Sequence, residues 1–469
     1  MFLFFLTSGL FLGWSLGAND AANIFGSAVG TKMVKYSAAV IIASVFVILG
    51  AVLQGYGASQ TLGDLGSINA IGGAFTVALC AGLTVFWMTK LNLPVSTSQG
   101  IIGAIIGWNF YSGSPTDLTI LSKIIGTWVA GPILGGIFAI LLYLLLKFIL
   151  TKRKIHLLKL DAYLKYGLLI VGAFGAYSLG ANNVSNVVGV FIPSLPDINL
   201  NFGFFSLNAI QLLFLIGGTS IAFGIITYSK RVMMTVGNNL MKLSAESALI
   251  VVLSHSLVLF VFSSITLSNI VQSIGLPGIM LVPVSSSQAV VGAIVGIGLL
   301  KGGRGIQFEV LGKISLGWIA TPIIAGVTTF VSLFFMNNVF KMVVVQNENN
   351  VISNKINSVI TVPKIETTYN SVNLYQPLLF SVIAILLIVV VIMFITIRRK
   401  SSQTKEEASS DRLLKYESEE RLLQSELQKV NTENVKLEKQ IEHKRKEQMG
   451  IALSIIQKNQ FLEKLKTKI

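Results

Sequence analysis

Long stretches without a charged residue alternate with short polar segments along most of the chain. A membrane-spanning helix needs about 20 predominantly apolar residues, so most of these stretches fit one span and the longest fits two. Another apolar run begins at Met1 and contains one charged residue, Asp20, before Lys32. The pattern predicts an all-α polytopic membrane protein. The uncharged stretches are residues 36–57, 65–89, 91–116, 124–146, 166–196, 198–229, 247–300, 314–340 and 376–397.

The composition supports a membrane protein and argues against other classes. Charged residues make up 12% of the 469 residues, and the mean hydropathy is +0.73, whereas soluble domains carry about 25% charged residues. The net charge of +15 falls largely in short loops, as the positive-inside rule describes. We therefore expect membrane lipid as a partner and no nucleic acid. The single cysteine, Cys80, excludes intramolecular disulfides.

Three sequence blocks occur twice in the same order, which indicates an internal duplication. Chance similarity between apolar segments would not preserve the polar residues within them. The blocks are SLGANDAAN at 15–23 and SLGANNVSN at 178–186, PVSTSQGIIGAIIG at 94–107 and PVSSSQAVVGAIVG at 283–296, and LSKIIGTWVAGPILGG at 121–136 and LGKISLGWIATPIIAG at 311–326.

Basic residues predict how the two copies are oriented. Clusters at 147–165, at Lys230 and Arg231, and at 398–400 mark cytoplasmic segments. Threading the chain through them places the N-terminus outside and the C-terminal tail in the cytoplasm of a cell with an inner, cytoplasmic membrane. The second copy then runs upside down. Inverted repeats with broken helices or re-entrant hairpins are the build of many secondary transporters, whose binding site lies near the membrane midplane.

The predicted domain organisation follows from the repeats and from a change of composition after residue 340. The segments are a first transporter repeat at 1–150, a basic cytoplasmic linker at 151–165, a second inverted repeat at 166–340, a polar extracytoplasmic loop at 341–375, a final transmembrane helix at 376–398 and a cytoplasmic helical or coiled-coil tail at 399–469.

The repeated GAN motif has the chemistry of a cation site. Asp20 and Asn23 lie in an apolar run, and the second copy places Asn183 and Asn186 at the matching positions. A carboxylate inside a membrane faces protein, water or an ion. We expect the glycines to open the backbone, so that carbonyl, amide and carboxylate oxygens surround a small cation such as Na⁺ at Asp20 and Asn23. The structural alternative is an Asn/Asp packing or capping cluster.

The repeated PVS motif has the chemistry of an anion site. A proline followed by hydroxyl residues and an apolar run is typical of a helix start, where free N–H groups and the positive dipole end attract an anion. Neither copy contains Lys or Arg. The structural alternative is a pair of capped, packed short helices. The candidate residues are Ser96, Thr97, Ser98 and Gln99 in the first copy, and Ser285, Ser286, Ser287 and Gln288 in the second.

Together these motifs resemble the inorganic phosphate transporter (PiT) family over about residues 1–340. The resemblance implies symport of inorganic phosphate with Na⁺, or with H⁺ in some members, and assigns the GAN residues to cation sites and the PVS residues to phosphate. One departure concerns Asn183, where the family pattern usually has Asp, which puts the number of cations in question. The resemblance leaves open a related oxyanion such as sulfate.

Other features leave further alternatives. His255 could relay protons, but a packed helix-facing histidine is the preferred interpretation, and Asp64 and Glu309 are expected to be solvated. We expect no enzyme activity, no cofactor beyond the co-transported Na⁺ or H⁺, and a homodimer. The tail has a short heptad seam, and a second amphipathic helix is expected after it. The seam residues are Leu423, Leu427, Val430, Asn434, Leu437 and Ile441. A phosphate receptor or scaffold that signals through this tail is the competing hypothesis.

Overall fold

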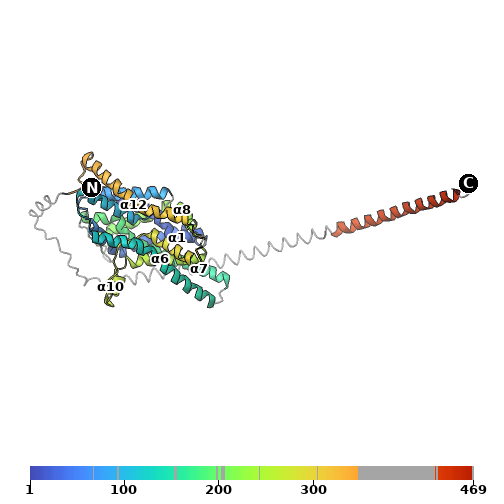
Figure 1. Ribbon diagram of the computed structural model, residues 1–469, viewed down its shortest axis with the longest axis horizontal. Helices are drawn as coiled ribbons and strands as arrows, with labels where there is room; N and C mark the ends of the chain where they lie inside the picture. The colour runs from blue at the N-terminus through green and yellow to red at the C-terminus, as the bar shows by residue number, and fades with distance from the viewer. Residues whose placement is uncertain are drawn as a thin grey trace, which may run out of the picture. The chain divides into compact units, whose positions relative to one another are not determined.

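The computed structural model divides the chain into two units, Met1–Val359 and Ile360–Ile469. The first is a bundle of helices (Figure 1), and the described residues of the second form one long helix. The residues that the structure describes are 1–66, 68–91, 95–152, 156–196, 199–201, 206–241, 243–303, 305–346, 428 and 431–466.

Twelve α-helices and a 3₁₀-helix make up most of the described part of the first unit. Seven described helices are long and apolar enough to cross a membrane, or eight if one bent pair forms a single span. This confirms the expected polytopic helical fold, while the expected span at 376–397 lies outside the described residues. The elements are α1 (Phe2–Gly30), α2 (Tyr36–Gln54), α3 (Tyr56–Leu65), α4 (Ile71–Lys90), α5 (Thr97–Ser112), α6 (Leu118–Lys152), α7 (Leu157–Val188), η1 (Gly189–Ser194), α8 (Ala209–Asn239), α9 (Ala245–Val261), α10 (Ile265–Ser273), α11 (Ser286–Leu300) and α12 (Phe308–Asn338).

A small hairpin occupies the first part of the uncharged stretch at 198–229. Strand β1 (Asn199–Asn201) pairs antiparallel with β2 (Ser206–Asn208), with Leu200 opposite Leu207. Asn208 then caps α8: its side chain accepts from the Gln211 backbone N–H, and the Gln211 side chain accepts from the Asn208 N–H. This reciprocal capping box fixes the start of the helix, so only the later part of the stretch is helical.

Helix packing repeats between the two halves of the first unit. Helix α1 packs on α8 and α2 on α7, while α5 packs on α12 and α6 on α11. Glycines make these contacts close. A Cβ added at Gly103 of α5 would overlap the carbonyl oxygen of Pro322, and one added at Gly292 of α11 would overlap that of Pro132. Such small-residue contacts let membrane helices approach each other without a hydrophobic driving force.

The helices that carry the GAN motifs are not broken, which corrects one expectation. Both α1 and α7 continue without interruption through Asp20 and Asn183. The glycines of the motif serve packing instead, since a Cβ at Gly17 would overlap the Ile221 carbonyl of α8 and one at Gly180 would overlap the Val47 carbonyl of α2.

Helical structure is interrupted instead before the two short helices that carry the PVS motifs. Helix α5 has 16 residues and α11 has 15. The described residues directly before them, 95–96 and 277–285, have no regular structure. Helices α9 and α10 meet at a bend of 71°, and α10 projects from the bundle (Figure 1). The expectation of broken helices therefore holds at these places and fails at the GAN motifs.

A short segment after α12 forms a strap over the start of α4; we use this term for residues 341–346. The Trp108 indole N–H donates to the Val344 carbonyl at 3.1 Å. The Asn69 side chain pairs with the backbone of Gln346, donating to its carbonyl at 2.9 Å and accepting from its N–H at 3.0 Å. Val344 is buried. The strap thereby joins the end of the second half to the first.

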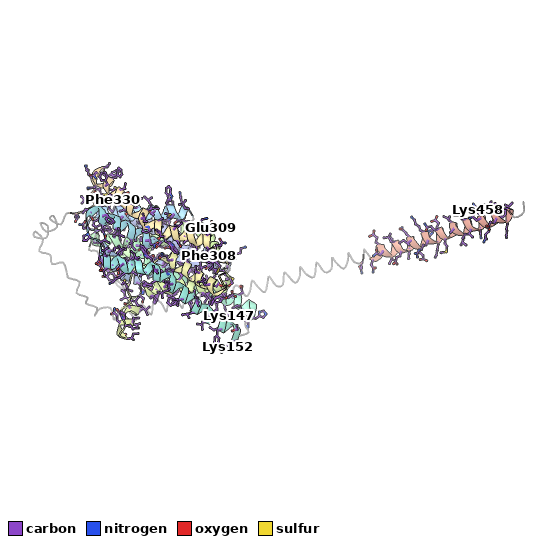
Figure 2. All side chains as sticks on the ribbon, in the orientation of Figure 1. Lys147, Lys152, Phe308, Glu309, Phe330 and Lys458 are labelled. Carbon is purple, nitrogen blue, oxygen red and sulfur yellow. The ribbon has the colours of Figure 1, made fainter. Side chains whose placement is uncertain are left out.

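Basic residues gather at one end of α6, where Figure 2 shows Lys147 and Lys152 close together. This is the segment that the sequence analysis assigned to the cytoplasm. Figure 2 also labels Lys458, which lies on the helix of the second unit. That helix covers 431–466 in one piece, whereas the sequence analysis expected a second helix after Ile441. Leu423, Leu427 and Val430 of the proposed seam lie outside the described residues.

Candidate functional site

The two GAN motifs and the two PVS motifs lie in the interior of the first unit. Asp20, on α1, is 2% exposed, and Asn183, its counterpart on α7, is 1% exposed. Each GAN helix makes side-chain hydrogen bonds to the PVS motif of the opposite half. The structure thus brings the sequence-predicted residues together in two half-sites. All eight PVS candidates are buried, namely Ser96, Thr97, Ser98, Gln99, Ser285, Ser286, Ser287 and Gln288.

The acidic half-site consists of Asp20 and Asn23 of α1, Ser286 of α11 and His255 of α9. The Asn23 side-chain nitrogen donates to Asp20 Oδ1 at 3.1 Å and to Ser286 Oγ at 3.0 Å. His255 Nε2 lies 2.9 Å from the same hydroxyl. A carboxylate, an amide, a hydroxyl and an imidazole therefore form one continuous hydrogen-bonded chain.

The neutral half-site consists of Asn183 and Asn186 of α7, Ser98 of α5 and the Val284 carbonyl. The Asn186 side-chain nitrogen donates to Asn183 Oδ1 and to Ser98 Oγ, both at 2.9 Å. Ser98 Oγ lies 3.1 Å from the Val284 carbonyl oxygen and 3.4 Å from Asn183 Oδ1. The arrangement resembles the acidic half-site but has neither a carboxylate nor an imidazole. The two serines also stand at different positions of the motif, because Ser98 aligns with Ser287 and Ser286 aligns with Thr97.

Two further asparagines hold the chain segments that lead into the short helices. The Asn19 side chain donates to the Val95 carbonyl at 3.0 Å. Its counterpart Asn182 donates to the Val282 carbonyl at 3.0 Å and accepts from the Val284 N–H at 2.9 Å. Backbone groups without regular structure need such partners in a dehydrated interior. The first asparagine of each copy of the block, Asn19 or Asn182, therefore positions a helix start.

Some of the hydroxyls expected to contact phosphate have a local structural role. Ser96 Oγ accepts from the Gln99 backbone N–H and Ser285 Oγ accepts from the Gln288 N–H, each at 3.2 Å. Both serines are therefore N-caps, which satisfy one of the free N–H groups at a helix start. Ser285 Oγ also lies 3.2 Å from Ser287 Oγ.

Several buried oxygens of these motifs have no hydrogen-bond partner among the residues that the structure describes. They are Thr97 Oγ1, Gln99 Oε1, Asn186 Oδ1 and Gln288 Oε1. Leaving such groups buried and unpaired costs free energy, and an oxygen of this type is a suitable ligand for a hard cation. Among side chains whose burial the structure describes, Asp20 is the one buried carboxylate, and no lysine or arginine is buried.

Sequence reasoning missed two residues of the site. The sequence analysis favoured a packing role for His255, yet its ring contacts Ser286. Its position within a long uncharged stretch was the sequence feature that could have indicated a role in the site. Asn182 was treated only as part of the repeated motif. Its alignment with Asn19 in the two blocks could have indicated a role of its own. Asp64 is exposed, as expected, and so is Glu309, which pairs with Lys313 at 2.6 Å.

These features define a polytopic α-helical membrane protein of the transporter class, with a buried polar centre shared by two matched halves. The chain belongs to the phosphate transporter family, whose sequence profile matches residues 16–271 and 276–457. The resemblance of the GAN and PVS motifs to that family is thereby confirmed.

Individual relatives share most of their length with this chain. A protein of Methanocaldococcus jannaschii named as a phosphate permease is 29% identical, over 70% of this chain and 95% of its own. One of Pyrococcus furiosus with the same description is 26% identical, over 68% of this chain and 92% of its own. Among solved structures, the fold is similar to that of "the sodium-dependent phosphate transporter", with a TM-score of 0.56 and 20% identity over 72% of this chain and 98% of that one.

Proposed function

We propose that this protein is a secondary active transporter that imports inorganic phosphate together with a cation, with Na⁺ favoured over H⁺. Family membership supports phosphate as the substrate. The observation that carries the coupled mechanism is Asp20, a buried carboxylate whose described partner is the neutral Asn23. A buried charge with only a neutral partner is costly, and a bound cation removes that cost.

The cation would be held mainly by neutral oxygens. Within the described ranges, no group of three or more His, Cys, Asp or Glu side chains is placed to hold a metal ion together. One carboxylate with amide and hydroxyl oxygens suits a monovalent hard cation. The candidates are Asp20 and Asn23 in one half, with Asn183 and Asn186 in the other. The name of the similar solved transporter also favours Na⁺.

Phosphate would lie between the starts of α5 and α11. Both helices present N-terminal backbone N–H groups and hydroxyls within the same polar interior. A helix N-terminus is a ready anion site because its N–H groups and its dipole favour negative charge. With no buried lysine or arginine among side chains of described burial, the co-bound cations would supply the balancing positive charge, so release of one favours release of the other.

The energetics of import support coupling to more than one cation. Moving one elementary charge across 100 mV is worth about 2.3 kcal/mol, so a divalent anion entering an inside-negative cell faces about twice that. Two monovalent cations offset this barrier, and a third would drive uptake.

Alternating access would exchange the roles of the two halves. The matched helix pairs and the crosswise bonds from Asn23 to Ser286 and from Asn186 to Ser98 support two related halves that share one site. We propose that the halves are inverted repeats in the inner membrane, with the N-terminus outside and the tail in the cytoplasm. Rocking of one half against the other would then expose the site to each side in turn.

Uptake into proteoliposomes tests this function. Purified protein is reconstituted, and radiolabelled phosphate uptake is measured under an imposed Na⁺ gradient, an imposed H⁺ gradient or neither, with sulfate as a competitor. We expect uptake that follows the Na⁺ gradient and resists excess sulfate. Uptake that follows only the H⁺ gradient would identify H⁺ as the coupling ion instead of Na⁺. Strong competition by sulfate would show that the substrate is not specifically phosphate. Binding of phosphate without uptake would support a receptor instead.

The tail gives a second test of transporter against receptor. Truncation after Lys400 removes the helix at 431–466 and keeps the half-sites. We expect phosphate uptake per reconstituted molecule to remain within about twofold of the full chain, because every residue of the polar centre lies in the first unit. Loss of uptake in a truncated protein that still reaches the membrane would contradict this and show that the tail is part of the transport machinery.

A further inference from the structure

We propose that His255 is a positioning residue that turns the Ser286 hydroxyl into a hydrogen-bond donor for the bound anion. The inference rests on the proposed function, since it takes phosphate as the anion. His255 is fully buried on α9, and its Nε2 lies 2.9 Å from Ser286 Oγ. It acts through this serine, which stands at the start of α11, where the helix N-terminus favours an anion.

The donor and acceptor roles at Ser286 follow from its neighbours. The Asp20 carboxylate can only accept, so it fixes the Asn23 side-chain amide with its NH₂ group toward Asp20 and Ser286. Asn23 is therefore a donor to Ser286 Oγ. This leaves the hydroxyl one further lone pair and its own proton.

The histidine tautomer decides what happens to that proton. His255 Nδ1 is buried and has no hydrogen-bond partner in the described part of the chain. A proton on Nδ1 would leave an unsatisfied N–H in the interior, which is rarer in proteins than an unsatisfied acceptor. The favoured tautomer carries the proton on Nε2 and donates it to Ser286 Oγ. Both lone pairs of the hydroxyl are then occupied, and no other partner within the described residues lies within hydrogen-bonding distance of Ser286 Oγ. Its O–H is directed to a ligand.

Ser98 in the neutral half-site shows the opposite arrangement. It also accepts from an asparagine, Asn186, but its own proton has a protein acceptor, the Val284 carbonyl oxygen at 3.1 Å. No histidine lies in α4, the helix that precedes α5. Of these two serines, Ser286 therefore offers its proton to a ligand through His255, and Ser98 retains its own within the protein.

This difference makes a specific claim about binding. An O–H that is already aligned donates to a phosphate oxygen without reorientation, and hydrogen bonds to charged groups are among the stronger ones in proteins. Removal of the imidazole donor would free a lone pair of Ser286, and the hydroxyl could turn away from the anion. The effect would be seen in the half-saturation concentration for phosphate, while the turnover of the loaded transporter would change little.

The test is phosphate uptake by variants at position 255, reconstituted as full chains. His255→Phe keeps a ring of similar volume but removes the donor, and His255→Gln restores an N–H near the position of Nε2. We expect His255→Phe to raise the half-saturation concentration for phosphate about tenfold with maximal uptake nearly unchanged. His255→Gln should remain within about threefold of the wild type. Ser256→Ala is the matched control, because Ser256 is equally buried on α9 but, within the described residues, hydrogen-bonds only to the Val252 carbonyl.

A double-mutant cycle separates positioning from general packing. If His255 acts through Ser286, His255→Phe should have little further effect on phosphate half-saturation in a Ser286→Ala background. Thermal unfolding in detergent shows which variants are folded. Should His255→Phe not fold, His255→Asn serves instead, since its shorter amide does not reach Ser286 and should behave as a loss variant against His255→Gln.

Each outcome bears on a different claim. Equal phosphate half-saturation in the wild type and in the loss variant would overturn the inference about His255 and leave phosphate import standing. Additive effects of the two substitutions would also overturn it, because His255 would then act independently of Ser286. Absence of phosphate uptake by the wild type itself would refute the proposed function.

Discussion

The acidic and neutral half-sites share one plan and differ in charge. In each, an asparagine of the GAN motif donates both to the residue three positions earlier and to a serine of the opposite PVS motif. The residue three positions earlier is Asp20 in one half and Asn183 in the other. In the proposed mechanism, the duplicated backbone would set where ligands are held, while two side chains, Asp20 and His255, would determine what each half can hold.

The difference teaches that the halves should not bind cations equally. Asp20 can offset a cation with its own charge, whereas Asn183 offers only a dipole. A cation at the neutral half-site would depend on the negative charge of the bound phosphate. Binding there should therefore be weaker and coupled to substrate, and substitutions that exchange the two residues test this directly.

The largest effect is expected from Asp20→Asn, which makes the two halves alike in charge. Dehydrating a cation without a charged partner costs about 3 kcal/mol or more of binding free energy. This corresponds to a loss of about a hundredfold in apparent Na⁺ affinity. Uptake measured against Na⁺ concentration should show near loss of Na⁺-dependent transport. The control is Asp64→Asn, an exposed carboxylate on α3, which should leave the curve unchanged. Wild-type Na⁺ dependence in Asp20→Asn would remove Asp20 from the coupling mechanism.

The next effect compares the two serines that accept from Asn23 and Asn186. Ser286→Ala should raise the half-saturation concentration for phosphate about tenfold, because it deletes a donor to a charged ligand. Ser98→Ala should raise it only about threefold, because the Ser98 proton is already bonded to the Val284 carbonyl. Both are read from uptake against phosphate concentration. The reverse order would show that the neutral half supplies the stronger anion contact.

A smaller effect in the opposite direction is expected from Asn183→Asp, which adds a carboxylate to the neutral half-site. Apparent Na⁺ affinity should tighten about fivefold, which corresponds to ~1 kcal/mol. Maximal uptake should fall, because the ion is released more slowly. The measurement is the Na⁺ half-saturation and the maximal uptake rate together. Weaker Na⁺ affinity in this variant would show that no cation binds near residue 183.

The smallest difference between the halves is expected in packing. Gly103→Ala and Gly292→Ala each force a Cβ against the carbonyl of a facing proline, and overpacking of this kind costs about 1–3 kcal/mol. The midpoint temperature of thermal unfolding in detergent should fall by similar amounts in both variants. Gly126→Ala, on α6 with nothing within 4 Å of its added Cβ, is the control and should not destabilise. Unequal losses would show that the halves differ in packing as well as in charge.

The sequence predicted the helices better than their interruptions. The uncharged stretch at 36–57 corresponds closely to α2 (Tyr36–Gln54), because an apolar run of span length has few other stable arrangements in a bilayer. The expected opening of α1 at its glycines was wrong, because the role of Gly17 is set by the Ile221 carbonyl. That residue is distant in sequence, and no local pattern reports such a contact.

The residues of the candidate site likewise divide into those that the sequence made visible and those that only the fold identifies. Duplication made the GAN and PVS residues visible, because polar residues repeated within apolar segments have few structural explanations. His255 occurs once and has no counterpart in α4, so repetition could not mark it. Only the fold places its ring against Ser286.

The strap at 341–346 has a practical consequence for shortening or extending the chain. The last described helix of the first unit, α12, ends at Asn338, and a designer could draw a boundary there for a minimal protein or for attaching a tag. Such a cut would leave the Trp108 indole and both polar groups of Asn69 without the partners that Val344 and Gln346 supply. It would also remove the buried Val344 side chain from the start of α4. A boundary that keeps these contacts therefore lies beyond Gln346.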